Sequence, residues 1–244
     1  DAAGYCDRNN APRISNLNVV AVPADGSVTF ETPNETEVTI SLNQRYGVHF
    51  RITDDLMQKS KYPIQKEYGK KAGFALAKQI ESDLLGMHST LSQDAATATG
   101  GPGTAPTDMD ESYFTFAIQL LDDGLCPPDN RYFICSPKVK RDLRLLNRLT
   151  SEETRTGSGK QLTSGKITMD WHGVEILSTP LVKTASSQRK NIMWSKEAFA
   201  LAIQKKVSMT EFARDGWRRN FGAMEVYGFG ETRDAEAVVV STVS

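Results

Sequence analysis

Few side chains in this sequence are of the types that carry out catalysis. The best nucleophile candidate is Cys135, which directly precedes Ser136 and Pro137. Those two residues are typical of a helix N-terminus, where the pKa of a thiol is lowered. The apolar run Tyr132 to Cys135 favours a buried core thiol instead, and we prefer that interpretation. A cytosolic hydrolase that uses Cys135 is the alternative hypothesis.

Metal-binding patterns are absent from the sequence. The three histidines lie far apart and show no HExxH or similar spacing: His49, His88 and His172. The three cysteines are odd in number and contain no CxxC pair: Cys6, Cys126 and Cys135. Neither a disulfide framework nor a zinc site is indicated, and a reducing compartment fits best. We therefore predict no catalytic, cofactor-binding or metal-binding residues and no cofactor.

Two glycine-rich stretches and two basic stripes are candidates for phosphate binding. GGPG at 100–103 and GSGK at 157–160 do not match GxxxxGK[ST], and neither lies between a strand and a helix. They are predicted to be flexible linkers. The basic stripes lie on two predicted helices: Lys66, Lys70, Lys71 and Lys78, and Lys140, Arg141, Arg144 and Arg148. Such stripes are either solvated faces or surfaces that contact acidic neighbours or phosphates non-specifically.

Composition narrows the class of protein. The 244 residues include 39% hydrophobic residues, which is enough for a sizeable core in one large domain or two small ones. The net charge of -1 excludes a strong overall attraction to nucleic acid or to a membrane surface. No apolar run approaches the about 18 residues of a membrane span, so no membrane partner is expected.

One predicted strand is unusually long. Residues 37–53, EVTISLNQRYGVHFRIT, alternate apolar and polar side chains, and only Gln44 breaks the apolar parity. A strand of about 15 residues would measure roughly 50 Å, whereas a compact chain of this length is about 45 Å across. Either the strand bends, with Gly47 as the simplest place, or the molecule is not compact.

A long helix is predicted after this strand. Residues 64–87 place apolar side chains at steps of three and four, with Ser60 as a cap and Pro63 in the first turn. The helix would be roughly 36 Å long. Gly69 and Gly73 lie one turn apart inside it, which indicates either the close approach of another backbone or simple tolerance of glycine.

Polar and turn-forming segments separate the other elements. Residues 1–13 are polar and are predicted to form an extended arm, followed by a hairpin with a turn at 23–26 and a breaker at Pro33. Residues 92–110 are small, polar and rich in glycine and proline, so we expect a mobile loop at a subdomain boundary. Residues 150–165 are predicted to be a second flexible loop.

The second half of the sequence predicts a mixed sheet with helices packed on it. A helix is expected over 111–123, and a buried strand at 132–135 leads into the helix capped by Ser136. Residues 191–206 are interpreted as a strand joined to a helix capped by Ser195. Late strands are expected over 221–230 and 236–244. The fold class is therefore α+β.

The order of these features resembles the major capsid proteins of tailed bacteriophages, which have the Hong Kong 97-type fold. Four stretches carry the resemblance: TEVTISLNQRYGVHFRITDD entering YGKKAGFALAKQIESDLL, LDDGLCPPDNRYFICSPKVKRDL, SKEAFALAIQK, and FGAMEVYGFGETRDAEAVVV. The similarity covers nearly the whole chain and rests on collinearity. Some members of the family form a Lys to Asn isopeptide cross-link, but the reacting residues have no match here.

The resemblance implies a division of the chain into named parts. An N-terminal arm would span 1–13 and an extended hairpin loop 14–41, which overlaps a neighbouring subunit. A peripheral domain would span 42–111 and contain the spine helix, 63–91. An axial domain would span 112–244, with 221–230 returning to the peripheral sheet.

The resemblance also implies a structural function without enzymatic activity. Copies of the chain would assemble as hexamers and pentamers into an icosahedral phage head around double-stranded DNA, which they contact non-specifically. Portal and scaffolding proteins, and decoration proteins, would be further partners. The protein would be assembled in the cytoplasm of the host bacterium and reside in the virion capsid. The alternative within the same fold is the shell of an encapsulin-like compartment.

Overall fold

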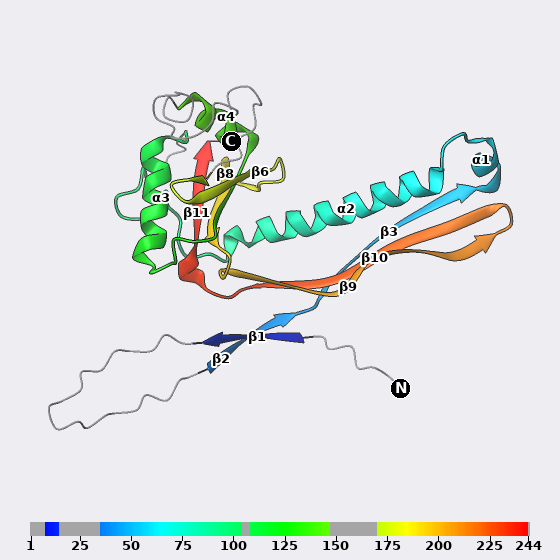
Figure 1. Ribbon diagram of the computed structural model, residues 1–244, viewed down its shortest axis with the longest axis horizontal. Helices are drawn as coiled ribbons and strands as arrows, with labels where there is room; N and C mark the ends of the chain where they lie inside the picture. The colour runs from blue at the N-terminus through cyan, green and yellow to red at the C-terminus, as the bar shows by residue number, and fades with distance from the viewer. Residues whose placement is uncertain (1–7, 15–34, 104–107, 147–169, 244) are drawn as a thin grey trace. The chain divides into compact units, whose positions relative to one another are not determined.

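The computed structural model describes residues 8–14, 35–103, 108–146 and 170–243, which form two compact units (Figure 1). The first unit contains the described residues of Asp1–Lys61 together with Ala200–Thr232, and the second those of Tyr62–Phe199 together with Arg233–Ser244. The predicted hairpin turn at 23–26, the breaker at Pro33 and the predicted loop at 150–165 lie outside the described residues.

The first unit is built on a three-stranded sheet in the order β3-β10-β9. Its strands are β3 (Gln44–Thr53), β10 (Arg218–Glu231) and β9 (Phe199–Asp215). The central strand β10 pairs antiparallel with β3, with Phe221 opposite Phe50 and Gly222 opposite His49. Residues 221–230, which we predicted to be a strand, lie within β10, and 221–227 pair with β3. β9 extends the same sheet.

The long alternating segment forms two strands rather than one. Strand β2 (Glu35–Ser41) ends before Leu42 and Asn43, and β3 begins at Gln44. The predicted alternation is confirmed, because every second side chain of β3 is more exposed than its neighbours. The predicted bend at Gly47 is wrong, since Gly47 lies inside β3. The interruption between the two strands falls at Leu42 and Asn43, directly before Gln44.

A further strand occupies part of the predicted polar arm. Strand β1 (Arg8–Ile14) pairs antiparallel with β2, from Arg8 opposite Ser41 to Ile14 opposite Glu35. The sequence of β1 shows no apolar alternation, so its strand structure was not predicted. Backbone pairing with β2 supplies the hydrogen bonds that hold an extended segment without an apolar face.

The helix predicted after Ser195 is wrong. The residues from Phe199 to Asp215 form β9, a strand of 17 residues, and Ser195 is the last residue of the preceding strand. Alanine, leucine, lysine and glutamine favour a helix here by propensity, but pairing with β10 decides the structure. A short helix that was not predicted, α1 (Asp54–Lys59), follows β3 directly.

The second unit begins with the predicted long helix. Helix α2 (Ile64–Gly86) has 23 residues and continues as the 3-10 helix η1 (Met87–Ser89), which agrees with the expected range. Pro63 stands at the N-cap, so Ser60 does not cap the helix as predicted. Within α2 three side chains are buried, Ala72, Leu76 and Leu85.

A mixed sheet forms the core of the second unit, as predicted. Its order is β11-β8-β4-β6-β5, and β7 pairs with β8. β4 runs parallel to β6 and antiparallel to β8. The strands are β4 (Arg131–Cys135), β5 (Asp170–Trp171), β6 (Val174–Ser178), β7 (Thr184–Ala185), β8 (Gln188–Ser195) and β11 (Ala237–Val243), with the 3-10 helix η3 (Asp234–Glu236) before β11.

Two helices complete this unit, and both begin with a side-chain cap. In α3 (Glu111–Asp123) the Asp110 carboxylate accepts a hydrogen bond of 2.7 Å from the Tyr113 amide. In α4 (Pro137–Leu145) the Ser136 hydroxyl accepts one of 3.4 Å from the Val139 amide, as predicted. Their apolar faces contribute to a core whose aromatic members are Tyr113, Phe114, Phe133 and Trp171.

The segment after η1 is more ordered than predicted. Ala95 and Ala96 are buried, and the Ala95 amide donates to the Val239 carbonyl at 2.8 Å. The Val239 amide in turn donates to the Gln93 carbonyl at 2.8 Å. This part of residues 92–110 is therefore held against β11, and the prediction of a mobile loop is wrong for it. Small side chains allow this close packing, which sequence composition alone does not distinguish from mobility.

Candidate functional site

The best predicted nucleophile is inaccessible. Cys135 is the last residue of β4 and its exposed fraction is 0%. Burial raises the pKa of the Cys135 thiol to about 12, against a smaller opposing effect of Lys140. A thiol that is buried and protonated at neutral pH does not attack a substrate, so the core interpretation is confirmed and the hydrolase hypothesis loses its nucleophile.

The second buried cysteine is also held as a thiol. Burial is the main cause that raises the pKa of Cys126. The neighbouring Arg131 guanidinium is occupied, because it donates to the carbonyls of Pro127 and Cys126 and pairs with Asp122 at 2.6 Å. Among the described residues no group of three histidine, cysteine or acidic side chains is placed to hold a metal ion.

The three histidines of the sequence lie on three different elements. His49 is exposed on β3 and its ring contacts Phe212 edge-on, with the ring centroids 5.7 Å apart. His88 contacts the Leu85 carbonyl through Nδ1, and His172 lies in the turn between β5 and β6 with a positive φ. Each of the three histidines therefore lies on a different element and contacts a residue other than a histidine.

The basic stripes are partly paired within the chain. On α4, Lys138 pairs with Asp108, Arg141 pairs with Asp142, and Lys140 donates to Ser178. On α2, Lys70 pairs with Glu67 at 2.9 Å, while Lys66, Lys71 and Lys78 are exposed. Arg148 lies outside the described residues.

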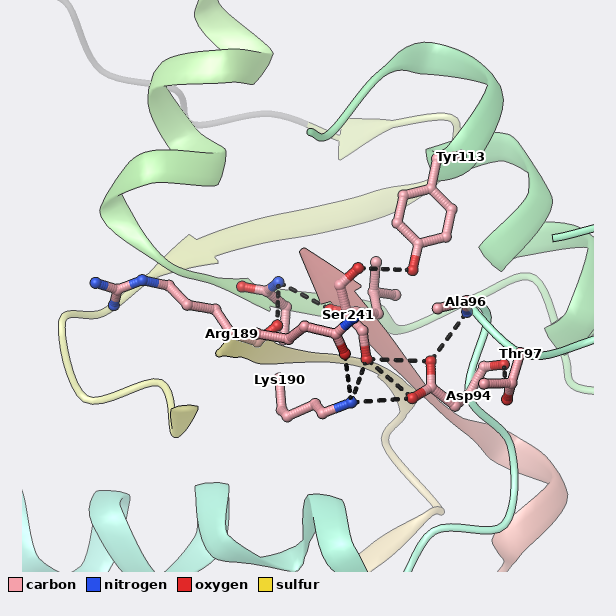
Figure 2. Close-up of polar contacts among 10 residues, drawn as sticks. Asp94, Ala96, Thr97, Tyr113, Arg189, Lys190 and Ser241 are labelled. Carbon is pink, nitrogen blue, oxygen red and sulfur yellow. Dashed lines mark hydrogen bonds and ion pairs between the residues drawn. The ribbon is translucent and has the colours of Figure 1, made fainter. Parts of the chain in front are cut away.

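A polar cluster joins three segments of the second unit, and sequence reasoning missed it (Figure 2). The Lys190 ammonium on β8 lies 3.2 Å from an Asp94 carboxylate oxygen and 2.7 Å from the Ser241 hydroxyl on β11. The second Asp94 oxygen accepts from the Ala96 amide at 2.9 Å. The charges compensate each other, so the cluster fixes the segment after η1 on the sheet rather than activating a group.

Two buried side chains extend this cluster. The Tyr113 hydroxyl donates to the Ser241 carbonyl at 3.0 Å, and burial together with the Asp94 charge raises the pKa of Tyr113. The Asn191 amide group donates to the Val240 carbonyl at 2.9 Å and its oxygen accepts from the Ser136 amide at 2.9 Å. The sequence did not indicate these hydrogen bonds, because the partners of each polar side chain are distant along the chain.

A second charged cluster fixes one end of the sheet in the first unit. The Asp54 carboxylate accepts from Arg214 at 2.8 Å and from Arg219 at 2.9 Å. The Asp54 amide also donates to the Trp217 carbonyl, at the turn between β9 and β10. The hydrogen bond from Arg214 outweighs the opposing effect of burial, and Arg219 adds to it, so the pKa of Asp54 lies below its ordinary value.

Most of the large exposed apolar side chains described in the first unit lie on β9 and the adjoining turn. Phe212 is 59% exposed and Trp217 is 78% exposed. The other large apolar side chains that are exposed along β9 share one parity: Leu201, Ile203, Val207 and Met209. Among the described strands, β9 pairs only with β10 and forms an edge of the sheet. An exposed apolar row beside a sheet edge is typical of surfaces that associate.

A family model and solved structures both match this chain. Residues 36–241 match the family model described as phage capsid protein. No curated protein shows significant similarity to the chain. No helix among the described residues is both long enough and apolar enough to span a membrane.

Solved structures with similar folds cover nearly the whole chain. A structure from Mycobacterium phage Che8 has 19% identity and a TM-score of 0.73, and the alignment covers 96% of this chain and 84% of the phage chain. The capsid of a native GTA particle has 13% identity and a TM-score of 0.69, with 98% and 86% covered. The capsid of the cyanophage P-SCSP1u has 14% identity and a TM-score of 0.67, with 98% and 84% covered.

Proposed function

This chain belongs to the phage capsid protein family, and from that premise we propose that its copies assemble as hexamers and pentamers into an icosahedral head around double-stranded DNA. The chain is a major capsid protein, and its α+β fold is the Hong Kong 97-type fold of phage capsids. The family match over residues 36–241 is the observation that carries the proposal.

The elements of the chain support self-association. Helix α2 has 23 residues, roughly 34 Å, yet its side chain Phe74 is 74% exposed. Strand β9, at the edge of its sheet among the described strands, exposes an apolar row. In a closed shell such surfaces are buried against neighbouring copies, which supplies the apolar burial that the single chain lacks.

We assign the parts of the chain to the parts of the family subunit as a proposal. The hairpin loop at 14–41 would overlap a neighbouring copy, and the peripheral domain at 42–111 would contain the spine helix at 63–91. The axial domain at 112–244 would place its loops near the centres of hexamers and pentamers. Pairing of β10 with β3 supports including 221–230 in the peripheral sheet, and β9 extends that sheet to residue 199.

The further partners are proposed from family membership alone. Copies of the chain would assemble in the cytoplasm of a host bacterium, with portal and scaffolding proteins, and decoration proteins would bind the shell. Packaged double-stranded DNA would be contacted non-specifically. The exposed lysines of α2 and the near-neutral net charge are compatible with such weak contacts.

Expression of the full chain followed by electron microscopy and sedimentation tests the proposal. We expect closed particles or capsomers built from many copies. A protein that stays a compact monomer under all assembly conditions, including coexpression with the other head proteins, would contradict it. Particles isolated from infected or induced cells should protect double-stranded DNA from nuclease, whereas particles filled with a protein cargo would indicate a compartment shell.

A further inference from the structure

The central strand of the sheet in the first unit is longer than its pairing with β3. Strand β10 ends at Glu231, whereas the pairing ends at Tyr227, opposite Gln44. Residues 228–231 therefore continue past the beginning of β3 and lie against the end of β2. At this place the chain crosses itself, because the backbone that leads from β2 to β3 passes over β10.

Gly228 makes this crossing possible. A side chain added at Gly228 would lie 2.9 Å from the carbonyl carbon of Ser41 and 3.1 Å from the Cα of Leu42. Since Cβ atoms project from the face of a strand, the backbone of β2 lies against the face of β10 rather than beside its edge. Gly228 is not among the described glycines with positive φ, so this position needs the missing side chain and not an unusual backbone conformation.

A second glycine of β10 receives a side chain from β2. A Cβ at Gly230 would lie 3.4 Å from Cγ1 of Ile40, whose side chain is only 3% exposed. Gly228 and Gly230 are two residues apart and therefore face the same side of the strand. Among the side chains described over 37–43, Ile40 is the only buried one. One buried side chain and one stretch of backbone thus anchor β2 on β10.

Polar and aromatic contacts continue from the crossing into the sheet. The Gln44 side-chain amide donates to the Asn43 side-chain oxygen at 3.1 Å, and the Tyr46 hydroxyl donates to the Gln44 oxygen at 3.3 Å. The ring of Tyr46 stacks on Tyr227, with the ring centroids 6.0 Å apart, and Tyr227 is fully buried. The residues that follow the crossing are therefore tied to the buried residue that precedes Gly228.

Strands β1 and β2 leave the crossing as one piece, which we call the β1–β2 ribbon. They pair along their full length, from Arg8 opposite Ser41 to Ile14 opposite Glu35. The seven residues of β2 span roughly 20 Å, so a change of about 15° at Ser41 would displace the far end of the ribbon by about 5 Å. The geometry at the crossing is thus amplified along the ribbon.

We infer that Gly228 is a positioning residue for assembly, because the close crossing of Ser41 and Leu42 over it sets the direction in which the β1–β2 ribbon leaves the sheet. This inference rests on the proposed function, since copies in a closed shell must meet at defined angles. A ribbon whose direction is fixed in the free subunit also avoids the cost of ordering it during association.

Distance measurements on the unassembled full chain test the direction of the ribbon. Spin labels are attached at Glu37→Cys in β2 and Lys205→Cys in β9, both at exposed positions of the first unit. Cys6 is replaced by serine, and the two other cysteines are buried. Double electron–electron resonance then reports the distance between the two strands, and we expect one narrow distribution for the chain with Gly228.

Gly228→Ala should change this distance. Ordinary contact begins at 3.4 Å, so the new Cβ must push the backbone of Ser41 aside, and backbone cannot rotate away as a side chain can. Glu37 lies four residues, about 13 Å, beyond Ser41, so a tilt of about 15° should shift the mean distance by about 3 Å. An unchanged distance in a folded Gly228→Ala subunit would overturn the inference.

Two other glycines of β10 provide matched controls. Gly230→Ala places its Cβ at an ordinary contact distance from Ile40, so the ribbon should keep its direction. Gly222→Ala lies in the part paired with β3 and crowds only the side chains of His49 and Phe212, which can move. Both variants should keep the distance of the unmodified chain. A shift in Gly230→Ala equal to that in Gly228→Ala would mean that the crossing at Gly228 does not set the direction.

Assembly of the same variants tests the functional part of the inference. If Gly228→Ala leaves the productive direction in about a tenth of the subunits, the protein concentration needed for assembly should rise about tenfold. Light scattering and sedimentation velocity measure this concentration, and Gly230→Ala should not change it. A shifted distance with normal assembly would overturn the role of Gly228 in assembly. Failure of the unmodified chain to form particles would instead contradict the proposed function.

Ile40→Ala keeps the inference testable if Gly228→Ala does not fold. This variant removes the buried side chain that anchors β2 and introduces no clash. We expect a broader distance distribution around an unchanged mean, and a smaller rise in the concentration needed for assembly. A distribution as narrow as that of the unmodified chain would show that the crossing does not hold the ribbon, and the inference would be wrong.

Discussion

The two units of the chain differ in where their apolar side chains lie. In the second unit, Phe114 and Phe133 are fully buried and pack edge-on with ring centroids 5.5 Å apart. In the first unit, Phe221 is buried against Phe50, but the edge strand β9 exposes Phe212 and an aliphatic row. The second unit therefore has the core of an independent domain, whereas the first has surfaces that other copies can complete.

This difference separates residues that stabilise the subunit itself from residues that act in assembly. Substitutions in the core of the second unit should act on the stability of the isolated subunit, because the chain itself provides the packing. Substitutions along β9 should act mainly on assembly, because the packing partner is another molecule. Pairs of variants matched in residue type but placed in different regions make the comparison measurable.

The largest effect is expected from the buried phenylalanine. Phe133→Ala removes a fully buried ring from the centre of the mixed sheet and should lower the free energy of unfolding by about 3–5 kcal/mol. Phe212→Ala should lower it by about 1 kcal/mol or less, because the ring is largely exposed. Urea denaturation of the unassembled subunit measures both.

The contrast extends to assembly. Phe212→Ala should impair particle formation more than its effect on stability explains, and Phe133→Leu, which retains most of the buried volume, should assemble normally once folded. Equal losses of stability for the two alanine variants would contradict the division into a self-sufficient core and a surface completed by other copies.

A smaller difference is expected for two asparagines. Asn191→Ala leaves the buried Ser136 amide and Val240 carbonyl without their partner, which should cost about 1–3 kcal/mol of unfolding free energy. Asn220→Ala removes an exposed hydrogen bond to Arg51 and should cost less than about 0.5 kcal/mol. Thermal unfolding of both variants at the same pH checks the order, and a larger loss for Asn220→Ala would overturn it.

Local patterns predicted several elements of the second unit and two strands of the first. The step of three and four residues over 64–87 predicted α2, and Ser136 with Pro137 predicted the start of α4. The alternation over 37–53 predicted the faces of β2 and β3. These features depend on neighbours within a few residues, which is why a single sequence contains them.

Features decided by distant partners were missed. β9 has the composition of a helix, and only its pairing with β10 makes it a strand. The segment around Asp94 has the composition of a mobile loop, yet Lys190 and Ser241, about 100 and 150 residues away, hold it on the sheet. The Asp54 cluster likewise joins residues about 160 positions apart. No local pattern encodes such pairs.

Acid should destabilise the first unit through Asp54. Its pKa lies below the ordinary value in the folded chain, so the carboxylate contributes stability above the ordinary aspartate pKa of about 4 and loses it as the pH falls through the lower folded value. Asp54→Asn should therefore be less stable than the unmodified chain at pH 7, and the difference should shrink near pH 3. Urea unfolding at the two pH values measures this change.

The neighbouring aspartate is the matched control for this pH dependence. Asp55 is exposed and pairs only with Lys59 within α1 among the described residues, so Asp55→Asn should change stability little at either pH. If both variants lose stability equally at pH 7, the cluster of Asp54 with Arg214 and Arg219 does not stabilise the end of the sheet.

A substitution at a helical glycine should raise stability, and its effect on particle formation separates the two explanations for glycine in α2. A side chain added at Gly73 meets no described atom of its own chain within 4 Å. Gly73→Ala should therefore raise the free energy of unfolding of the unassembled subunit by about 0.5–1 kcal/mol, because alanine favours the helix. Gly124→Ala should do the opposite, since the new side chain would lie 2.6 Å from the Ala235 carbonyl oxygen. If Gly73→Ala stabilises the subunit but impairs particle formation, another copy approaches the helix at Gly73, whereas normal assembly means that glycine is simply tolerated there.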